Sequence, residues 1–239
     1  MHIRKFYIGA FALLLALATF AQAQDFGRVV TTQFSAIGWD NAIRNVYYLN
    51  GDERIDLTIP NGAPSSLYEC RANQPLVFYR DGPAGPDGAT PTPIPVASTT
   101  LSAAAPPSLL LFFDQKNANV PYRIVSVKNE AQRSMQDIYQ LYNISRHKIV
   151  AQFNEERISI DPGKQLIINS PNIDKPNFGV MMAIQADPKD SGDWKLVYKA
   201  FWPYRTGRSS LVFITDKQGR DDQISVRRFY VSTPTPPKS

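Results

Sequence analysis

The stretch Ile59-Pro-Asn-Gly-Ala-Pro-Ser-Ser-Leu-Tyr-Glu-Cys-Arg-Ala-Asn-Gln-Pro-Leu-Val-Phe-Tyr-Arg-Asp81 sets a pattern that recurs along the chain. It predicts the end of a strand, a turn with glycine, a short polar strand, a second turn and an apolar strand. The same order returns in Ile160-Asp-Pro-Gly-Lys-Gln-Leu-Ile-Ile-Asn-Ser-Pro171, followed by the apolar run 179–185. Each copy then reaches an apolar run that ends in aspartate, at 108–114 and 210–216. This echo indicates a duplicated β unit.

The remaining sequence also consists of short apolar runs joined by turn residues. Asn50-Gly51 separates the runs 43–49 and 55–59, and this dipeptide favours a tight hairpin because both residues tolerate positive φ. Such runs recur at intervals of roughly ten residues, without helical periodicity. We therefore predict an all-β protein with two tandem antiparallel β-sandwich units, immunoglobulin-like or related. The alternative is one larger sandwich formed from two pseudo-repeats.

The pattern divides the chain into four parts. We expect a signal peptide at 1–23 and a first β-sandwich unit at 24–127, with a loop rich in proline and glycine at 82–95. A second unit is expected at 128–232, and the proline-rich tail 233–239 is predicted to be disordered because it has little apolar surface to bury.

The N-terminus has the features of an export signal. Arg4 and Lys5 precede an uncharged apolar run at 6–20, and Ala21-Gln-Ala23 supplies small residues for cleavage between Ala23 and Gln24. The run is shorter than the roughly 20 residues that a membrane-spanning helix needs. We therefore expect a secreted or periplasmic protein with no transmembrane segment in the mature chain.

Charge and cysteine content exclude several classes of protein. The chain has 26 Lys and Arg against 21 Asp and Glu, a formal net charge of +5, and these charges are scattered. A nucleic-acid-binding surface would need a basic cluster, so we expect no nucleic-acid partner. Cys70 is the single cysteine, so no intrachain disulfide can form, and we expect it to be a small buried hydrophobe.

Few residues suggest catalytic or metal-binding chemistry. His147 is the single histidine after the predicted signal, and its pairing with Cys70 or Ser145 is the candidate for a hydrolase of unfamiliar design. The acidic turn 216–222 offers oxygen ligands for calcium, although its Lys and Arg oppose cation binding. No Cys/His metal spacing and no nucleophile-elbow motif occur. We assign no catalytic, metal or cofactor-binding residue, expect no cofactor, and lean against an enzyme.

The run 193–202 contains the candidate ligand or partner surface. Strict alternation places Trp194, Tyr198 and Trp202 on one face of the predicted strand. A row of aromatic rings would offer a flat platform for sugar rings or for a partner protein. The same face would equally serve as the side of the strand that packs into the core. The sequence leaves both interpretations open.

The paired patterns YYLNG…IDLTIPNG…SSLYEC…QPLVFYRD and IYQLYNIS…ISIDPGKQLIINSP resemble exported bacterial proteins of duplicated β-sandwich type and unknown function. The resemblance implies a scaffold and transfers no catalytic residue. We expect a non-enzymatic structural or protein-interaction module of the cell envelope or secreted space. The alternatives are a carbohydrate-binding module that uses the aromatic strand face, and the hydrolase. The partner would be an envelope protein or a glycan, and the oligomeric state stays open.

Overall fold

The computed structural model describes residues 29–84, 91–103, 106–116, 119–129, 137–169, 177–185, 193–203 and 207–232, and all the secondary structure in these ranges is β-strand. The first eight strands are β1 (Val29–Gly38), β2 (Ile43–Asn50), β3 (Glu53–Ile59), β4 (Tyr68–Asn73), β5 (Leu76–Asp81), β6 (Pro93–Thr99), β7 (Ser108–Asp114) and β8 (Tyr122–Lys128). The next eight are β9 (Ile138–Asn143), β10 (Ile149–Phe153), β11 (Glu156–Ile160), β12 (Gln165–Asn169), β13 (Asn177–Gln185), β14 (Trp194–Pro203), β15 (Arg208–Lys217) and β16 (Arg220–Ser232).

The strands form four sheets whose orders repeat. The first eight strands make sheet A (β4-β1-β7-β8) and sheet B (β3-β2-β5-β6). The second eight make sheet C (β12-β9-β15-β16) and sheet D (β11-β10-β13-β14). Adding eight to every strand number converts A into C and B into D. The two tandem sandwich units predicted from the sequence are therefore confirmed, and the single larger sandwich is not observed.

Details of strand pairing repeat as well. In each unit the first strand pairs in parallel with the seventh, β1 with β7 and β9 with β15, while the other pairs are antiparallel. The register of β5 on β6 skips Val96, and that of β13 on β14 skips Val197, so both units carry a β-bulge at the same place. A bulge inserts one extra residue into one strand of a pair. Its recurrence supports the duplication. The strand order differs from the ABED and CFG order of antibody constant domains, so that likeness is limited to two facing sheets.

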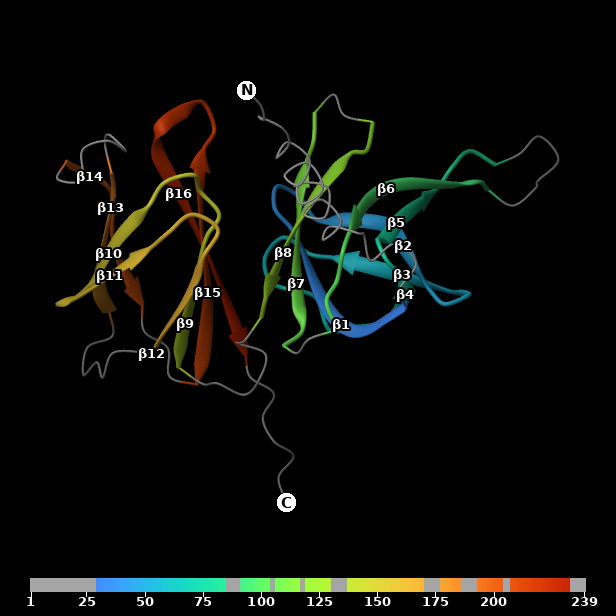
Figure 1. Cartoon of the computed structure of the whole chain (residues 1–239), viewed down its shortest axis with the longest axis horizontal. Helices are drawn as coiled ribbons and strands as arrows, with labels where there is room; N and C mark the ends of the chain where they lie inside the picture. Colours follow the sequence, from blue (N-terminus) through green and yellow to red (C-terminus); the bar gives the residue numbers. More distant parts are fainter. Residues whose placement is uncertain are drawn as a thin grey trace, which may run out of the picture.

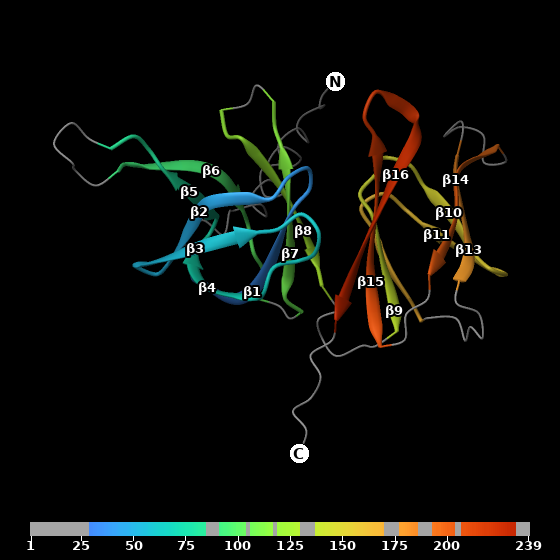
Figure 2. The ribbon, with the colours of Figure 1, turned by 180° about the vertical axis from the view of Figure 1, so that it is seen from behind.

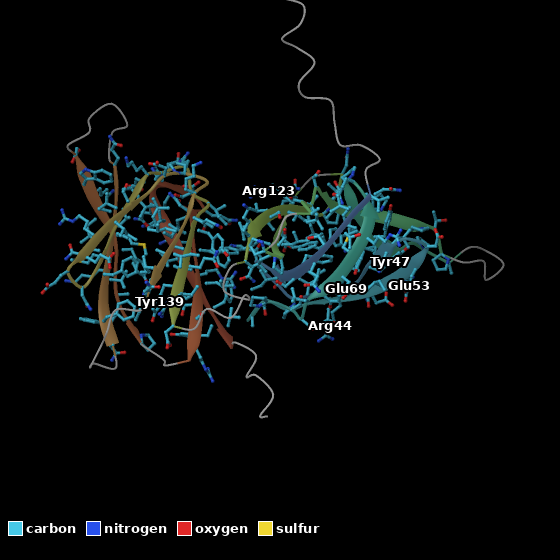
Figure 3. The ribbon with its side chains drawn as sticks, turned by 60° about the horizontal axis from the view of Figure 1, so that its bottom comes forward. Arg44, Tyr47, Glu53, Glu69, Arg123 and Tyr139 are labelled. Atoms are coloured by element: carbon cyan, nitrogen blue, oxygen red, sulfur yellow. The ribbon has the colours of Figure 1, made fainter. Side chains whose placement is uncertain are left out.

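Each unit has its own core, and a third core joins the units. One apolar cluster lies between sheets A and B and another between sheets C and D, where Figure 3 labels Tyr139. The third cluster lies between sheets A and C. Figure 1 and Figure 2 show β7 and β8 facing β15 and β16 across the middle of the molecule. The four sheets thus stack in the order B, A, C, D.

This stacking explains why two strands are apolar on both faces. On β7, Leu110 and Phe112 enter the core of the first unit, while Leu109 and Leu111 enter the core between the units. A strand with one wet face alternates apolar and polar residues, whereas a strand buried on both faces does not. The strand β15 divides its residues in the same way between the second and third cores.

Other predictions about the chain have mixed outcomes. The hairpin between β2 and β3 is confirmed, but Asn50 pairs with Glu53 as the last residue of β2, so the loop is Gly51-Asp52 and, of the Asn50-Gly51 pair, Gly51 alone has a positive φ, of 68°. The strand β6 begins at Pro93, inside the predicted loop 82–95, of which 85–90 lie outside the described residues. The predicted signal peptide and proline-rich tail also lie outside them. The domain boundaries, including that at 127/128, stay predictions.

Candidate functional site

The outer face of sheet D is a partly apolar surface that no other sheet of the described structure covers. Three large side chains of β14 are exposed there: Phe201 to 76%, Leu196 to 56% and Trp194 to 36%. Sheet D lies at the end of the molecule farthest from the first unit (Figure 1, left). Soluble proteins rarely leave adjacent large apolar side chains uncovered unless the surface binds something.

The bulge at Val197 produces this surface. In a regular strand Trp194, Leu196, Tyr198 and Trp202 would share one face, as the alternation predicted. The register shift turns Tyr198 and Trp202 toward the core and leaves Trp194 and Leu196 on the outer face. One inserted residue therefore separates the aromatic row into an inner and an outer half.

The structure does not bring the three predicted aromatic residues together on one surface. Trp202 is fully buried, and its ring lies 6.0 Å from that of Tyr139 in a stacked arrangement. Its Nε1 donates a hydrogen bond to Tyr198 Oη at 2.9 Å, so these two side chains contact each other inside the unit. Trp194 is the member of the set that lies on the outer face.

A groove of about 340 Å³ runs along this face. Its walls include Val150 of β10, Met181 and Ala183 of β13, and Trp194 and Leu196 of β14. Arg157 of β11 is the one charged residue among its lining residues. An apolar groove with a single convergent charge is the usual composition of a binding site in which one polar contact fixes the orientation of the ligand.

Two cations flank the apolar centre in one row across the sheet. Arg157 pairs with Gln152, Gln152 with Met181, and Met181 with Lys199, so the row runs from cation to cation. The ion pairs found among the described residues involve other cations. This face therefore combines apolar surface with positive charge that no described acid neutralises.

Two larger hollows occur in the first unit. One of about 540 Å³ is lined by Thr31, Gln33, Glu69 and Arg71, among others, and one of about 600 Å³ lies where β2, β4 and β5 meet. Their polar groups are partly used within the unit, since Asn50 Oδ1 accepts a hydrogen bond from the Arg71 amide at 2.6 Å. The larger one also includes exposed apolar side chains, Val29 to 55% and Leu49 to 41%, whereas sheet D exposes three large apolar side chains along one strand.

The candidate catalytic residues are not assembled. Ser145 Oγ donates to Asn143 Oδ1 at 2.6 Å, while the His147 ring lies 2.8 Å from the carbonyl oxygen of Asp221. Cys70 is buried in the core of the first unit, in the other sandwich, and burial raises the pKa of its thiol to about 11. No nucleophile therefore contacts the imidazole in the described part of the chain.

The acidic turn 216–222 holds protein cations. Asp221 contacts Arg146 Nη2 at 2.6 Å, and Asp216 lies 3.9 Å from Arg146 Nε. Asp222 forms an ion pair with Lys195, whose hydrogen bond lowers the pKa of the carboxyl below its ordinary value. Among the described residues, no three or more His, Cys, Asp or Glu side chains group as metal ligands do. Two of the three carboxylates thus lie near Arg146, and the third pairs with Lys195.

Comparisons with known proteins leave the family open. No family model matches the chain. No curated protein matches it either. Among solved structures, a "putative cell adhesion protein" from Bacteroides uniformis shares 7% identity, with 85% of this chain and 97% of that chain covered, at a TM-score of 0.21. A likeness at that TM-score carries no argument about this chain. In the described ranges, no helix has the length and hydropathy needed to cross a membrane.

Proposed function

We propose that the protein is a non-enzymatic interaction module of the cell envelope or secreted space, and that it binds a partner protein on the outer face of sheet D. The observation that carries this proposal is the exposure of Trp194, Leu196 and Phe201 along one strand. Exposed aromatic and aliphatic side chains with flanking cations are typical of the centre and rim of a protein interface. Export is proposed on the charged, apolar and small-residue segments of 1–23.

The composition of the groove favours a protein over a glycan. Sugar rings stack on aromatic faces, but their many hydroxyl groups also need hydrogen-bond partners. The groove walls are mostly Val, Met, Ala, Leu and Trp, with Gln152 and Arg157 as the polar members. Tyr198 and Trp202, which a glycan platform would need, are directed inward. A partner that brings apolar side chains fits this surface better.

Site-specific photo-cross-linking tests the proposal. A photoreactive amino acid replaces Leu196 in the full chain, which is produced in the native host. The matched control carries it at Ile94, which is 43% exposed on β6 of the first unit. We expect a discrete protein adduct from position 196 and none from position 94.

Three outcomes would overturn the proposal. Position 196 could give no adduct, or the two positions could give the same adducts, which would mean that the sheet D face has no specific protein partner. A glycan array on which the wild type binds and Leu196→Ser does not would replace the protein partner with a carbohydrate.

A further inference from the structure

The two units place an arginine at the same position of the repeat. Arg54 of β3 pairs with Leu49 of β2, and Arg157 of β11 pairs with Gln152 of β10. Two pairs further along, and so on the same face of the sheet, Tyr47 stands opposite Asp56, as Val150 stands opposite Ser159. These residues on the outer face of sheet B therefore have counterparts on the outer face of sheet D, and the contacts of the two sets can be compared.

In the first unit this arginine is fully engaged. Arg54 makes a bidentate contact with Asp81, at 2.8 and 3.1 Å, and its Nη2 lies 3.0 Å from Asp56 Oδ1. Its guanidinium carbon lies 3.8 Å from the centroid of the Tyr47 ring, one of the labelled side chains in Figure 3. Hydrogen bonds to Asp81 and then Asp56 raise the pKa of Arg54 above its ordinary value. Two carboxylates and one aromatic ring thus surround the cation.

The second unit keeps the arginine and lacks its acids. By the strand register, Asp56 corresponds to Ser159, Asp81 to Gln185 and Tyr47 to Val150. The side-chain contact of Arg157 in the described structure is a long hydrogen bond of 3.5 Å to Gln152 Oε1. Arg157 also lines the apolar groove, where Arg54 has an ion-pair cluster instead. The two acidic positions are neutral here, and apolar surface lies beside the cation.

We infer, building on the function proposed above, that Arg157 receives a carboxylate from the partner, in the role that Asp81 and Asp56 play for Arg54. The partner segment is a stretch of protein with an Asp or Glu beside a large apolar side chain. The carboxylate binds the guanidinium, and the apolar side chain enters the groove between Met181 and Leu196. Lys199, at the other end of the row, adds attraction for acidic segments.

The physical chemistry favours this combination. The planar guanidinium matches a carboxylate with two parallel hydrogen bonds, which a lysine cannot reproduce. Apolar contacts next to the pair exclude water and so strengthen the electrostatic attraction. An exposed ion pair alone would contribute little, so the groove and the cation are needed together.

Peptide selection on the full chain tests the inference. A phage-displayed library of random decapeptides is selected on the wild type, Arg157→Gln, Ser159→Asp and a matched control, Arg54→Gln. We expect wild-type selections to enrich an acid next to Leu, Ile, Phe or Trp. Arg157→Gln should keep the apolar preference and lose the acid. Ser159→Asp supplies an internal carboxylate next to Arg157, so peptides selected on it should also be apolar and lack the acid. The control Arg54→Gln should select the same peptides as the wild type.

Affinity measurements give the expected magnitude. By fluorescence anisotropy, a selected peptide should bind Arg157→Gln about tenfold or more weakly, because hydrogen bonds between a guanidinium and a carboxylate are stronger than those between neutral groups. Arg157→Lys should recover part of the loss. Raising the salt concentration should weaken binding to the wild type more than binding to Arg157→Gln.

The outcomes separate this inference from the proposed function. If the peptides selected on the wild type are apolar but carry no acid, and if Leu196→Ser weakens their binding, the carboxylate contact to Arg157 would be wrong. The proposed interaction surface on sheet D would still stand. If the selections enrich no peptide, or if Leu196→Ser selects the same peptides as the wild type, both the inference and the proposed function would be wrong. Binding of anionic lipid vesicles that is lost in Arg157→Gln, with no peptide enrichment, would replace the protein segment with a membrane surface and overturn the inference.

Discussion

Arg227 of β16 donates a hydrogen bond to the carbonyl oxygen of Trp39, which lies 188 positions earlier and follows β1 of the first unit. The guanidinium carbon lies 4.6 Å from the Trp39 ring centroid, and Nη2 lies 3.4 Å from the carbonyl oxygen of Asn61. Trp39 in turn stacks on Phe113 at 5.0 Å and meets the edge of Phe213 at 5.9 Å. A cation of the second unit thus holds backbone carbonyls of the first, beside the apolar core between them.

Removal of this cation should weaken the contact between the units. Arg227→Met keeps much of the apolar stem but leaves the Trp39 carbonyl without its partner, so we expect a loss of about 1–3 kcal/mol in the free energy of unfolding. Urea denaturation measures the change. Arg220→Met, at the exposed first residue of β16, is the control and should change stability little. Equal midpoints for the two variants would show that Arg227 contributes nothing to stability.

The single thiol should be unreactive in the folded protein. Burial raises the pKa of Cys70 to about 11, and the thiolate is the nucleophilic form, so very little of it exists near neutral pH. We expect slow reaction with an aromatic disulfide reagent at pH 8 and rapid reaction after denaturation in urea. Fast labelling of the native protein, at the rate of the denatured chain, would mean that Cys70 is accessible and that the thiol deserves a functional test.

The repeat could be predicted from sequence because its signals are local. Asn50-Gly51 and Asp161-Pro-Gly163 specify turns through their own backbone preferences, and Gly163 indeed has a φ of 71°. The apolar runs at 108–114 and 210–216 marked the positions of two strands, but not the partner that covers their second face. That partner is the other unit, and such pairing at long range leaves no local trace.

The candidate site was harder to predict. The sequence predicted that Trp194, Tyr198 and Trp202 share one face of the strand. The bulge at Val197 shifts the alternation, so Trp194 lies on the opposite face from the other two. A bulge depends on how two strands pair, so a single strand does not reveal it. Leu196, Phe201 and Arg157 were missed. An alignment of the two pseudo-repeats would have paired Arg54 with Arg157, and it would have shown the neutral residues that replace the two acids.

The ion pair between Lys195 and Asp222 should make stability depend on pH. It joins β14 at the edge of sheet D to the start of β16 in sheet C, and the hydrogen bond from Lys195 lowers the pKa of Asp222. A carboxyl with a lower pKa in the folded state contributes stability above its unfolded pKa and loses it as the pH falls through the folded pKa.

Thermal unfolding of the wild type and Asp222→Asn across acidic and neutral pH measures this contribution. We expect a small difference in Tm at neutral pH that disappears under acidic conditions and in high salt, because both residues are exposed. Lys195→Met should show the same pattern. A difference that persists at low pH would assign the effect to something other than the ionised carboxylate.

Trp202 and Trp194 should respond in opposite ways to substitution, since the bulge sends one inward and one outward. Trp202 is fully buried against Tyr139, Phe153 and Phe178, so Trp202→Ala should cost about 3–5 kcal/mol of unfolding free energy. Trp194 is 36% exposed, and Trp194→Ala should change stability by about 0.5 kcal/mol or less.

Denaturation in urea measures both changes in stability, and binding of a selected peptide gives the second readout. Trp194→Ala should weaken binding while the fold stays intact, because this ring lines the groove. If Trp194→Ala destabilises the protein as much as Trp202→Ala, the ring belongs to the core, and the outer face of sheet D loses one wall of its site.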